Sequence, residues 1–228
     1  MLALLLWHCA LTLGVSARHS DSPIVIERPL NRVEFDDLLM EYNHDQGPTS
    51  NLTVNASLTL NSARFADDIL RASLTLEQTW TDTRLLFKGV SEVPLPSNVH
   101  PWQPDTVIVN ALRSETRMAA LFLNYDGTLR KRQLLVIEVP CEEPLETNAE
   151  TIECRLILTS FSNRGVDEIT YSVENVDTDR VARITNATVA YDALQDHNHR
   201  RTHTATITVH VQNALHHNGD LIVEVSKA

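Results

Sequence analysis

Residues 139–156 read VPCEEPLETNAETIECRL, in which two cysteines enclose a short acidic segment between two strand-like flanks. Residues 134–139 before this segment are an apolar run, and Leu156 and Leu158 after it face the same way in an extended chain. Twelve residues separate the two cysteines, and none of the twelve is aromatic. Both flanks therefore have the pattern of β-strands.

The same pattern recurs along the chain. Apolar residues alternate with polar or small ones in residues 52–60, 70–76 and 205–211. Such alternation places one face of a strand in a core and the other in water. The dipeptides Asp126-Gly127 and Asn218-Gly219 are turn signals, and Asp-Gly between strands is typical of a hairpin. The sequence therefore predicts an all-β sandwich or barrel.

One short helix is expected near the N-terminus. In residues 31–43, NRVEFDDLLMEYN, apolar side chains recur at close to helical spacing and acidic residues come early. Gly47-Pro48 would end any helix that reached so far. No shift in composition marks a second domain, although about 210 residues would suit one all-β domain or two small ones.

Residues 1–17, MLALLLWHCALTLGVSA, are nearly all apolar and carry no acidic or basic side chain. They end in small residues, so we expect a signal peptide cleaved after Ala17 and a secreted chain of residues 18–228. A membrane anchor is the alternative, but the run is short for a span of about 20 residues. No later segment approaches the length of a membrane span.

Cleavage would remove Cys9 and leave Cys141 and Cys154 in an oxidising compartment. A disulfide between them is the economical interpretation, and two free thiols are the alternative. Three N-glycosylation sequons agree with export. Their asparagines are Asn51, Asn55 and Asn186.

The formal net charge of −11 argues against nucleic-acid partners and against anionic membrane surfaces. The sequence has no nucleophile elbow, zinc-protease motif or phosphate-binding loop, so we expect neither catalysis nor a cofactor. Histidines 197, 199, 203, 216 and 217 could hold zinc if they shared a face. An exposed loop tip explains them more simply, and we expect no metal.

Three motifs occur in a specific order. Trp80-Thr81-Asp82-Thr83-Arg84-Leu85 fits W-x-D-x-R-L, Trp102-Gln103-Pro104-Asp105 fits W-x-P-D, and Asp126-Gly127 precedes the cysteine ring. Over residues 31–212, this order resembles the extracellular ligand-binding domain of the Cys-loop receptors, the pentameric ligand-gated ion channels. The resemblance implies an immunoglobulin-like twisted β-sandwich with a short N-terminal α-helix, assembled as a homopentameric ring. It also implies packing roles for the motif residues Trp80, Asp82, Arg84, Trp102, Pro104 and Asp105.

The length and composition of the segment between Cys141 and Cys154 refine the resemblance. Membrane-bound receptors usually have thirteen residues between the cysteines, whereas the soluble acetylcholine-binding proteins have twelve, as here. In receptors an apolar, aromatic tip contacts the channel domain, but here the tip is Glu142-Glu143-Pro144-Leu145-Glu146. Burying these carboxylates without partners would be costly. A soluble member, with no channel helices before its end at Ala228, is therefore expected.

Ligands of the family bind between subunits, where aromatic residues cage a cation. The matching positions on the principal face are Val109, Phe161 and Tyr191. Those on the complementary face are Thr75, Phe122, Arg130 and Arg132.

Of the usual cage aromatics, only Phe161 and Tyr191 keep an aromatic ring, so we expect acetylcholine and nicotine to bind weakly or not at all. Arginine grips carboxylate and sulfonate oxygens, which favours an anionic or zwitterionic ligand. The alternative is that Arg130-Lys131-Arg132 is a solvated strand paired with acidic surface. Three other possibilities stay open: the ectodomain of a channel, an adhesion module, and a scaffold that has lost its ligand.

Overall fold

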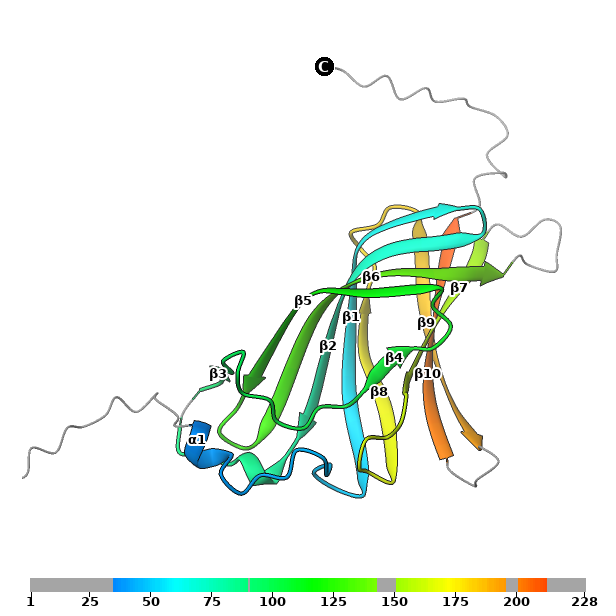
Figure 1. Cartoon of the computed structure of the whole chain (residues 1–228). Helices are drawn as coiled ribbons and strands as arrows, with labels where there is room; N and C mark the ends of the chain where they lie inside the picture. The colour runs from blue at the N-terminus through cyan, green and yellow to red at the C-terminus, as the bar shows by residue number, and fades with distance from the viewer. Residues whose placement is uncertain (1–34, 90, 143–150, 196–200, 213–228) are drawn as a thin grey trace, which may run out of the picture.

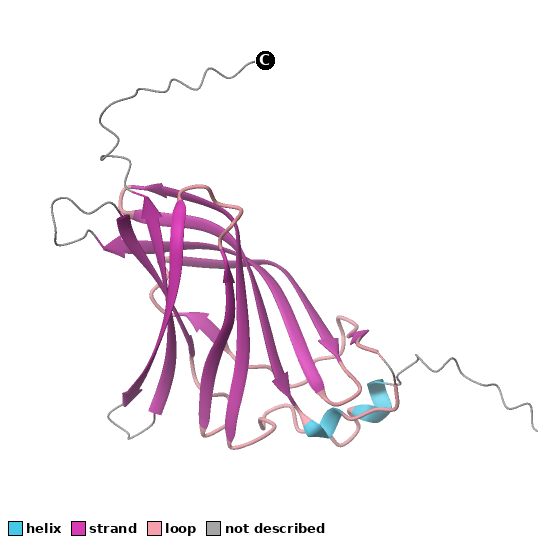
Figure 2. Ribbon diagram, turned by 180° about the vertical axis from the view of Figure 1, so that it is seen from behind, coloured by secondary structure: helices cyan, strands magenta, loops and turns pink. Residues whose placement is uncertain are grey.

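The chain folds into two β-layers with a short helical segment at one end, as Figures 1 and 2 show from opposite sides. This computed structural model describes residues 35–89, 91–142, 151–195 and 201–212. The predicted all-β sandwich is confirmed. The expected signal peptide and the Asn218-Gly219 turn lie outside the described residues.

Ten strands and two short helical turns make up the described chain. The strands are β1 Asn51–Ala66, β2 Ile69–Thr81, β3 Val93–Pro94, β4 Thr106–Ile108, β5 Arg113–Leu123, β6 Thr128–Glu142, β7 Thr151–Ser160, β8 Glu168–Asp177, β9 Ile184–Gln195 and β10 Arg201–Gln212. The helical turns are α1 Phe35–Leu38 and the 3₁₀ turn η1 Thr83–Leu85.

The strands form two layers that meet at one point. One layer has the order β8-β1-β2-β6-β5-β3, and the other has the order β9-β10-β7-β4. All neighbours are antiparallel except β1 and β8. Strand β6 pairs with β2 along most of its length and then reaches β7 through Cys141 and Glu142, which joins the layers.

The core follows the predicted alternation. Every second residue of β1 from Leu52 to Leu60 is buried, and so is every second residue of β2 from Leu70 to Trp80. In β10 the predicted inward residues, from Ala205 to Val211, are at most 2% exposed. Residues 134–139 are not buried throughout. Leu135, Ile137 and Val139 are buried, whereas the even-numbered residues between them are partly exposed. One face of β6 is therefore accessible.

The N-terminal helix is shorter than the sequence predicts. Only Phe35–Leu38 is α-helical among the described residues of that segment. After Leu39 the backbone hydrogen bonds shorten to three-residue steps, as in Tyr42 N to Leu39 O at 3.1 Å. Tyr42 is buried, and its hydroxyl donates to Asp82 Oδ2 at 2.6 Å. This long-range anchor fixes the chain where the apolar spacing alone would have continued the helix.

Asp82 is the centre of a buried polar cluster that holds this end together. Its carboxylate accepts from Arg84 Nε at 2.8 Å and from Arg84 Nη2 at 2.6 Å, and it is fully buried. The hydroxyl of Tyr42 in turn accepts from the backbone N–H of Trp102 at 3.0 Å. Trp102 is itself fully buried and donates its indole N–H to the carbonyl of Arg164. Both tryptophan motifs therefore contribute to packing, as the resemblance implies.

The Asp126-Gly127 dipeptide forms the turn between β5 and β6, as predicted. Gly127 has φ +81°, and a Cβ there would lie 2.5 Å from the carbonyl oxygen of Asp82. Its own carbonyl accepts from the N–H of Asp82 at 2.9 Å. Only glycine fits this turn, because the turn packs directly on the backbone of the motif aspartate.

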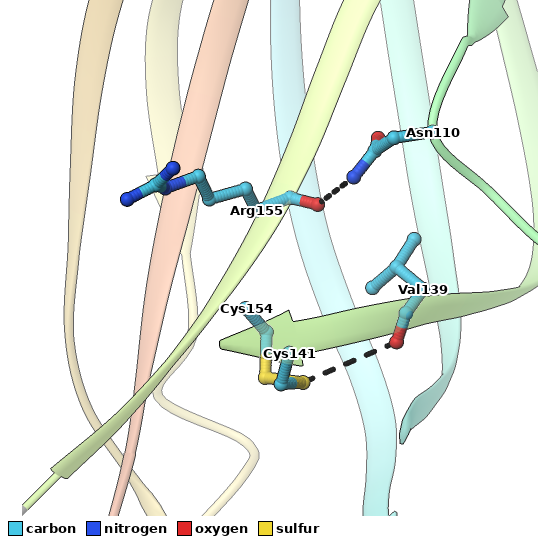
Figure 3. Close-up of a disulfide and its surroundings, with 5 residues drawn as sticks. All are labelled: Asn110, Val139, Cys141, Cys154 and Arg155. Carbon is cyan, nitrogen blue, oxygen red and sulfur yellow. Dashed lines mark hydrogen bonds between the residues drawn. A yellow bond between two sulfur atoms is a disulfide. The ribbon is translucent and has the colours of Figure 1, made fainter. Parts of the chain in front are cut away.

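The expected disulfide between Cys141 and Cys154 is present (Figure 3). Cys154 is fully buried, and Cys141 lies with its sulfur 4.0 Å from the carbonyl oxygen of Val139. The two cysteines are register partners, and with the adjacent pair Glu142 and Glu153 they make up the described pairing of β6 with β7. The bond therefore fastens the two layers at the end of the sandwich opposite α1 (Figure 1).

Candidate functional site

The loop after β7 presents Phe161 and is held by the aspartate of the W-x-P-D motif. Asp105 accepts from the backbone N–H of Ser162 at 2.7 Å and from its hydroxyl at 2.6 Å. The Ser160 hydroxyl donates to the other carboxylate oxygen of Asp105. Phe161, fixed between these two serines, is 81% exposed. The hydrogen bonds of Asp105 therefore fix a loop that presents a large aromatic ring to solvent.

Val109 is positioned by its neighbour Asn110. The Asn110 side-chain amide donates to the carbonyl of Arg155 at 2.7 Å (Figure 3). The amide oxygen of Asn110 accepts from the N–H of Ile157 at 3.1 Å. The backbone N–H of Val109 donates to the carbonyl of Ile157. These bonds extend the pairing of β4 with β7 by two residues and leave the Val109 side chain 58% exposed.

The structure brings Val109 and Phe161 together in the wall of one cavity of about 450 Å³. The opposite wall comes from the core-facing side of β2 and β6, at Leu76, Gln133 and Leu135. The cavity therefore opens between the two layers beside the expected principal face.

Tyr191 lies in β9 and is not among the residues that line this cavity. Its hydroxyl accepts from the backbone N–H of Val173 at 3.0 Å, although the residue remains 57% exposed. Its polar end therefore ties β9 to β8.

The four expected complementary residues gather on the outer face of the other layer. Thr75, Arg130 and Arg132 occupy the positions of β2 and β6 that alternate with buried residues. Phe122 in β5 is the register partner of Arg130, whose guanidinium carbon lies 4.3 Å from the centre of the Phe122 ring. The ring face of Phe122 is thus already covered by a cation of the same chain.

Two glutamates engage Arg130. Glu92 accepts from Nε at 2.8 Å and from Nη2 at 2.6 Å, and Glu77 accepts from Nη1 at 3.0 Å. The hydrogen bond to Arg130 lowers the pKa of Glu92, and the same bond raises the pKa of Arg130. Arg132 is exposed and forms no salt bridge with any residue of the described ranges. Arg130 is therefore paired with carboxylates, whereas Arg132 is exposed beside Glu77, its register partner in β2.

Residues 32–223 match the model of one protein family, described as neurotransmitter-gated ion-channel ligand binding domain. The chain belongs to this family. The match covers most of the sequence and includes the segments that carry both faces of the site. No curated protein matches the chain. In the part of the chain that the structure describes, no helix has the length and hydropathy that a bilayer span requires.

The histidines of this family member do not form a described metal site. His203 pairs with Glu168 through Nε2, which joins β10 to β8. The other four histidines of the possible cluster lie outside the described residues. Within the described ranges, no group of three potential metal ligands is close enough to hold an ion.

The three sequon asparagines lie on two strands. Asn51 and Asn55 are outward-facing residues of β1, and Asn186 is an exposed residue of β9. Asn55 is the register partner of Thr79, which in turn pairs with Arg130. A glycan on Asn55 would therefore lie two strands from Arg130 and one strand from β2, which carries Thr75.

Sequence reasoning missed the side chains that orient the site. Ser160 and Ser162 flank Phe161, and Glu77 and Glu92 engage Arg130. The only signal was that Ser160 and Ser162 bracket a predicted ligand position. The glutamates lie 53 and 38 positions from Arg130, so no local spacing connects them.

Proposed function

We propose that this chain is a secreted, soluble ligand-binding domain that assembles as a homopentamer and captures a small molecule at its subunit interfaces, without catalysis. Its apolar N-terminus supports secretion, and the acidic residues between the cysteines support a ring with no channel domain beneath it. Family membership favours this over an adhesion module. The ectodomain of a channel is the second candidate, because the same family contains it.

The lack of accessible aromatic rings at most of the cage positions supports weak acetylcholine binding. Val109 and Thr75 have no ring, Phe122 is covered by Arg130, and the hydroxyl of Tyr191 is bonded to β8. Phe161 alone offers a largely exposed ring. One desolvated cation–π contact is worth about 2 kcal/mol, which is too little to hold a quaternary ammonium tightly.

The charges support an anionic or zwitterionic ligand. Arg130 is balanced by its two glutamates, whereas Arg132 points outward beside it. An arginine without a carboxylate partner can bind a ligand carboxylate or sulfonate through two parallel hydrogen bonds. The apolar part of the ligand would contact Phe161 of the neighbouring subunit.

Isothermal titration with acetylcholine tests the ligand part of the proposal. We expect dissociation constants weaker than about 1 mM, which corresponds to about 4 kcal/mol of binding free energy. Micromolar binding would contradict it. A thermal-shift screen of small carboxylates, sulfonates and zwitterions should give hits that the Arg132→Gln variant loses.

Expression of the full sequence in a secretory host tests the location. We expect protein in the medium that begins at Arg18 and that loses mass on enzymatic removal of N-glycans. Retention in the membrane fraction with residues 1–17 intact would favour an anchored protein instead.

A further inference from the structure

Lys131 lies between two outward arginines but belongs to the opposite face of β6. Leu129 and Leu135, on the same face, are buried, and Lys131 is itself partly buried. Its register partners are Gln78 in β2 and Leu121 in β5. Gln78 is only 1% exposed. The lysine side chain is therefore directed toward the interior of the sandwich, away from Arg130 and Arg132.

The ammonium group of Lys131 has no described counter-ion. No carboxylate within the described ranges lies at salt-bridge distance from it, and desolvation together with the charge of Arg164 lowers its pKa. Gln78 Oε1 has no hydrogen-bond partner in the described structure. This neutral oxygen could accept a hydrogen bond from the ammonium group, but it cannot balance the charge. A partly buried cation without a counter-ion is unfavourable unless an anion is supplied from outside.

Lys131 also lines a cavity of about 330 Å³ on this side of the sheet. Its apolar wall includes Leu95, Val99 and Leu121, and its polar wall includes His100 and Gln103. Among the described lining residues, none is aspartate or glutamate. The volume is at the lower end of the range for small-molecule sites. The cavity thus combines apolar walls with a single ammonium group.

We propose that this cavity binds a small organic anion, with the carboxylate paired to Lys131 and the apolar part packed against Leu95, Val99 and Leu121. The charge of Lys131 supplies the recognition and the apolar walls supply contact area. This site lies within one subunit and is separate from the interface site of the proposed function. It does not depend on ring assembly or on Arg132.

The experiment compares 3-phenylpropionate with its neutral amide, 3-phenylpropionamide, by isothermal titration against the purified secreted protein. We expect the carboxylate to bind the wild type and the amide to bind at least about tenfold more weakly. Lys131→Met removes the charge and keeps most of the side-chain volume, so it should weaken carboxylate binding at least about tenfold. Lys88→Met, at an exposed lysine outside the cavity, is the matched control and should bind as the wild type does.

Two further variants distinguish binding in this cavity from binding at the interface site. Ala119→Trp fills the cavity from an exposed position in β5, so it should abolish binding while circular dichroism shows an intact fold. Arg132→Gln should leave the affinity unchanged. Equal binding by Lys131→Met and the wild type, or equal binding of acid and amide, would overturn the proposal. Loss of binding in Arg132→Gln alone would place the anion at the interface site and would also overturn it.

Discussion

At the scale of single residues, the proposed site differs from an aromatic cage at Val109 and Thr75. Both side chains are accessible, so larger residues fit there without disturbing the core. We predict that the double variant Val109→Tyr, Thr75→Trp binds acetylcholine at least about tenfold more tightly than the wild type, because each new ring adds up to about 2 kcal/mol. Titration calorimetry measures this. Leu112→Tyr, at another exposed residue of the same segment, is the control, and an equal gain there would refute the position assignments.

The Asp82 cluster makes stability depend on pH at the same scale. Burial alone would raise the pKa of Asp82, but hydrogen bonds from Arg84 and Tyr42 outweigh it and hold the pKa below its usual range. The ionised form therefore stabilises the fold above the unfolded pKa of about 4, and this contribution is lost as the pH falls through the lower folded pKa. We predict that Asp82→Asn is less stable by about 1–3 kcal/mol at pH 7.

Urea unfolding at pH 7 and at about pH 3 checks this prediction. The wild type should lose more stability than Asp82→Asn between the two values, since the variant has no carboxylate to protonate. Asp179→Asn, at an exposed position, should behave as the wild type does. An identical loss in wild type and Asp82→Asn would show that other carboxylates dominate acid unfolding.

At the scale of elements, Asp105 connects the start of β4 to the loop that follows β7. Asp105→Ala removes the acceptor for both serine hydroxyls and for the Ser162 N–H. We predict a loss of about 1–3 kcal/mol in unfolding free energy and faster hydrogen exchange at residues 160–163. Mass spectrometry after exchange in heavy water reports the loop directly. Ser162→Ala removes a single hydroxyl and should have the smaller effect, so a larger effect there would contradict the central role of Asp105.

The sequence predicts strands well where buried residues alternate with accessible ones along the chain. The alternating residues of β1, β2 and β10 lie in the core as expected, because one layer covers the other along their length. The predicted helix extends too far because the spacing of apolar residues contains no information on the hydrogen bond from Tyr42 to Asp82, 40 positions away. Residues 134–139 alternate in burial because the outer face of β6 is uncovered in a single chain.

The candidate site is predictable only in part, for the same reason. Motif spacing places Val109 and Phe161, and the structure sets both in one cavity. Spacing alone does not show that Phe122 already holds a guanidinium, or that Glu92 neutralises Arg130. Phe122 and Arg130 meet across the β5–β6 hairpin because of its register, and Glu92 lies 38 positions before Arg130, so both contacts depend on strand pairing that local spacing does not show.

At the scale of the whole molecule, the two faces of the site cannot serve one ligand within one chain. Phe161 follows β7 in one layer, whereas Thr75 and Arg132 point outward from the other layer. A second copy must bring its outer β2–β6 face to the Phe161 loop. In the proposed assembly the same two faces occur on every copy, so the contact would be head-to-tail, and such contacts form a closed ring where the rotation between subunits closes. The proposed homopentamer predicts that light scattering gives five times the mass of the mature chain.

A substitution at Met118 tests whether the proposed subunit interface forms. It is 69% exposed and pairs with Leu134, the strand neighbour of Thr75, so the proposed contact would cover it. Met118→Glu places a charge in that contact and should shift the protein toward smaller species, since burying an unpaired carboxylate is costly. Met40→Glu, at a methionine that is 78% exposed near α1, should leave the mass unchanged. A monomeric wild type would remove the basis for an intersubunit site, because Phe161 and Arg132 would then never face the same molecule.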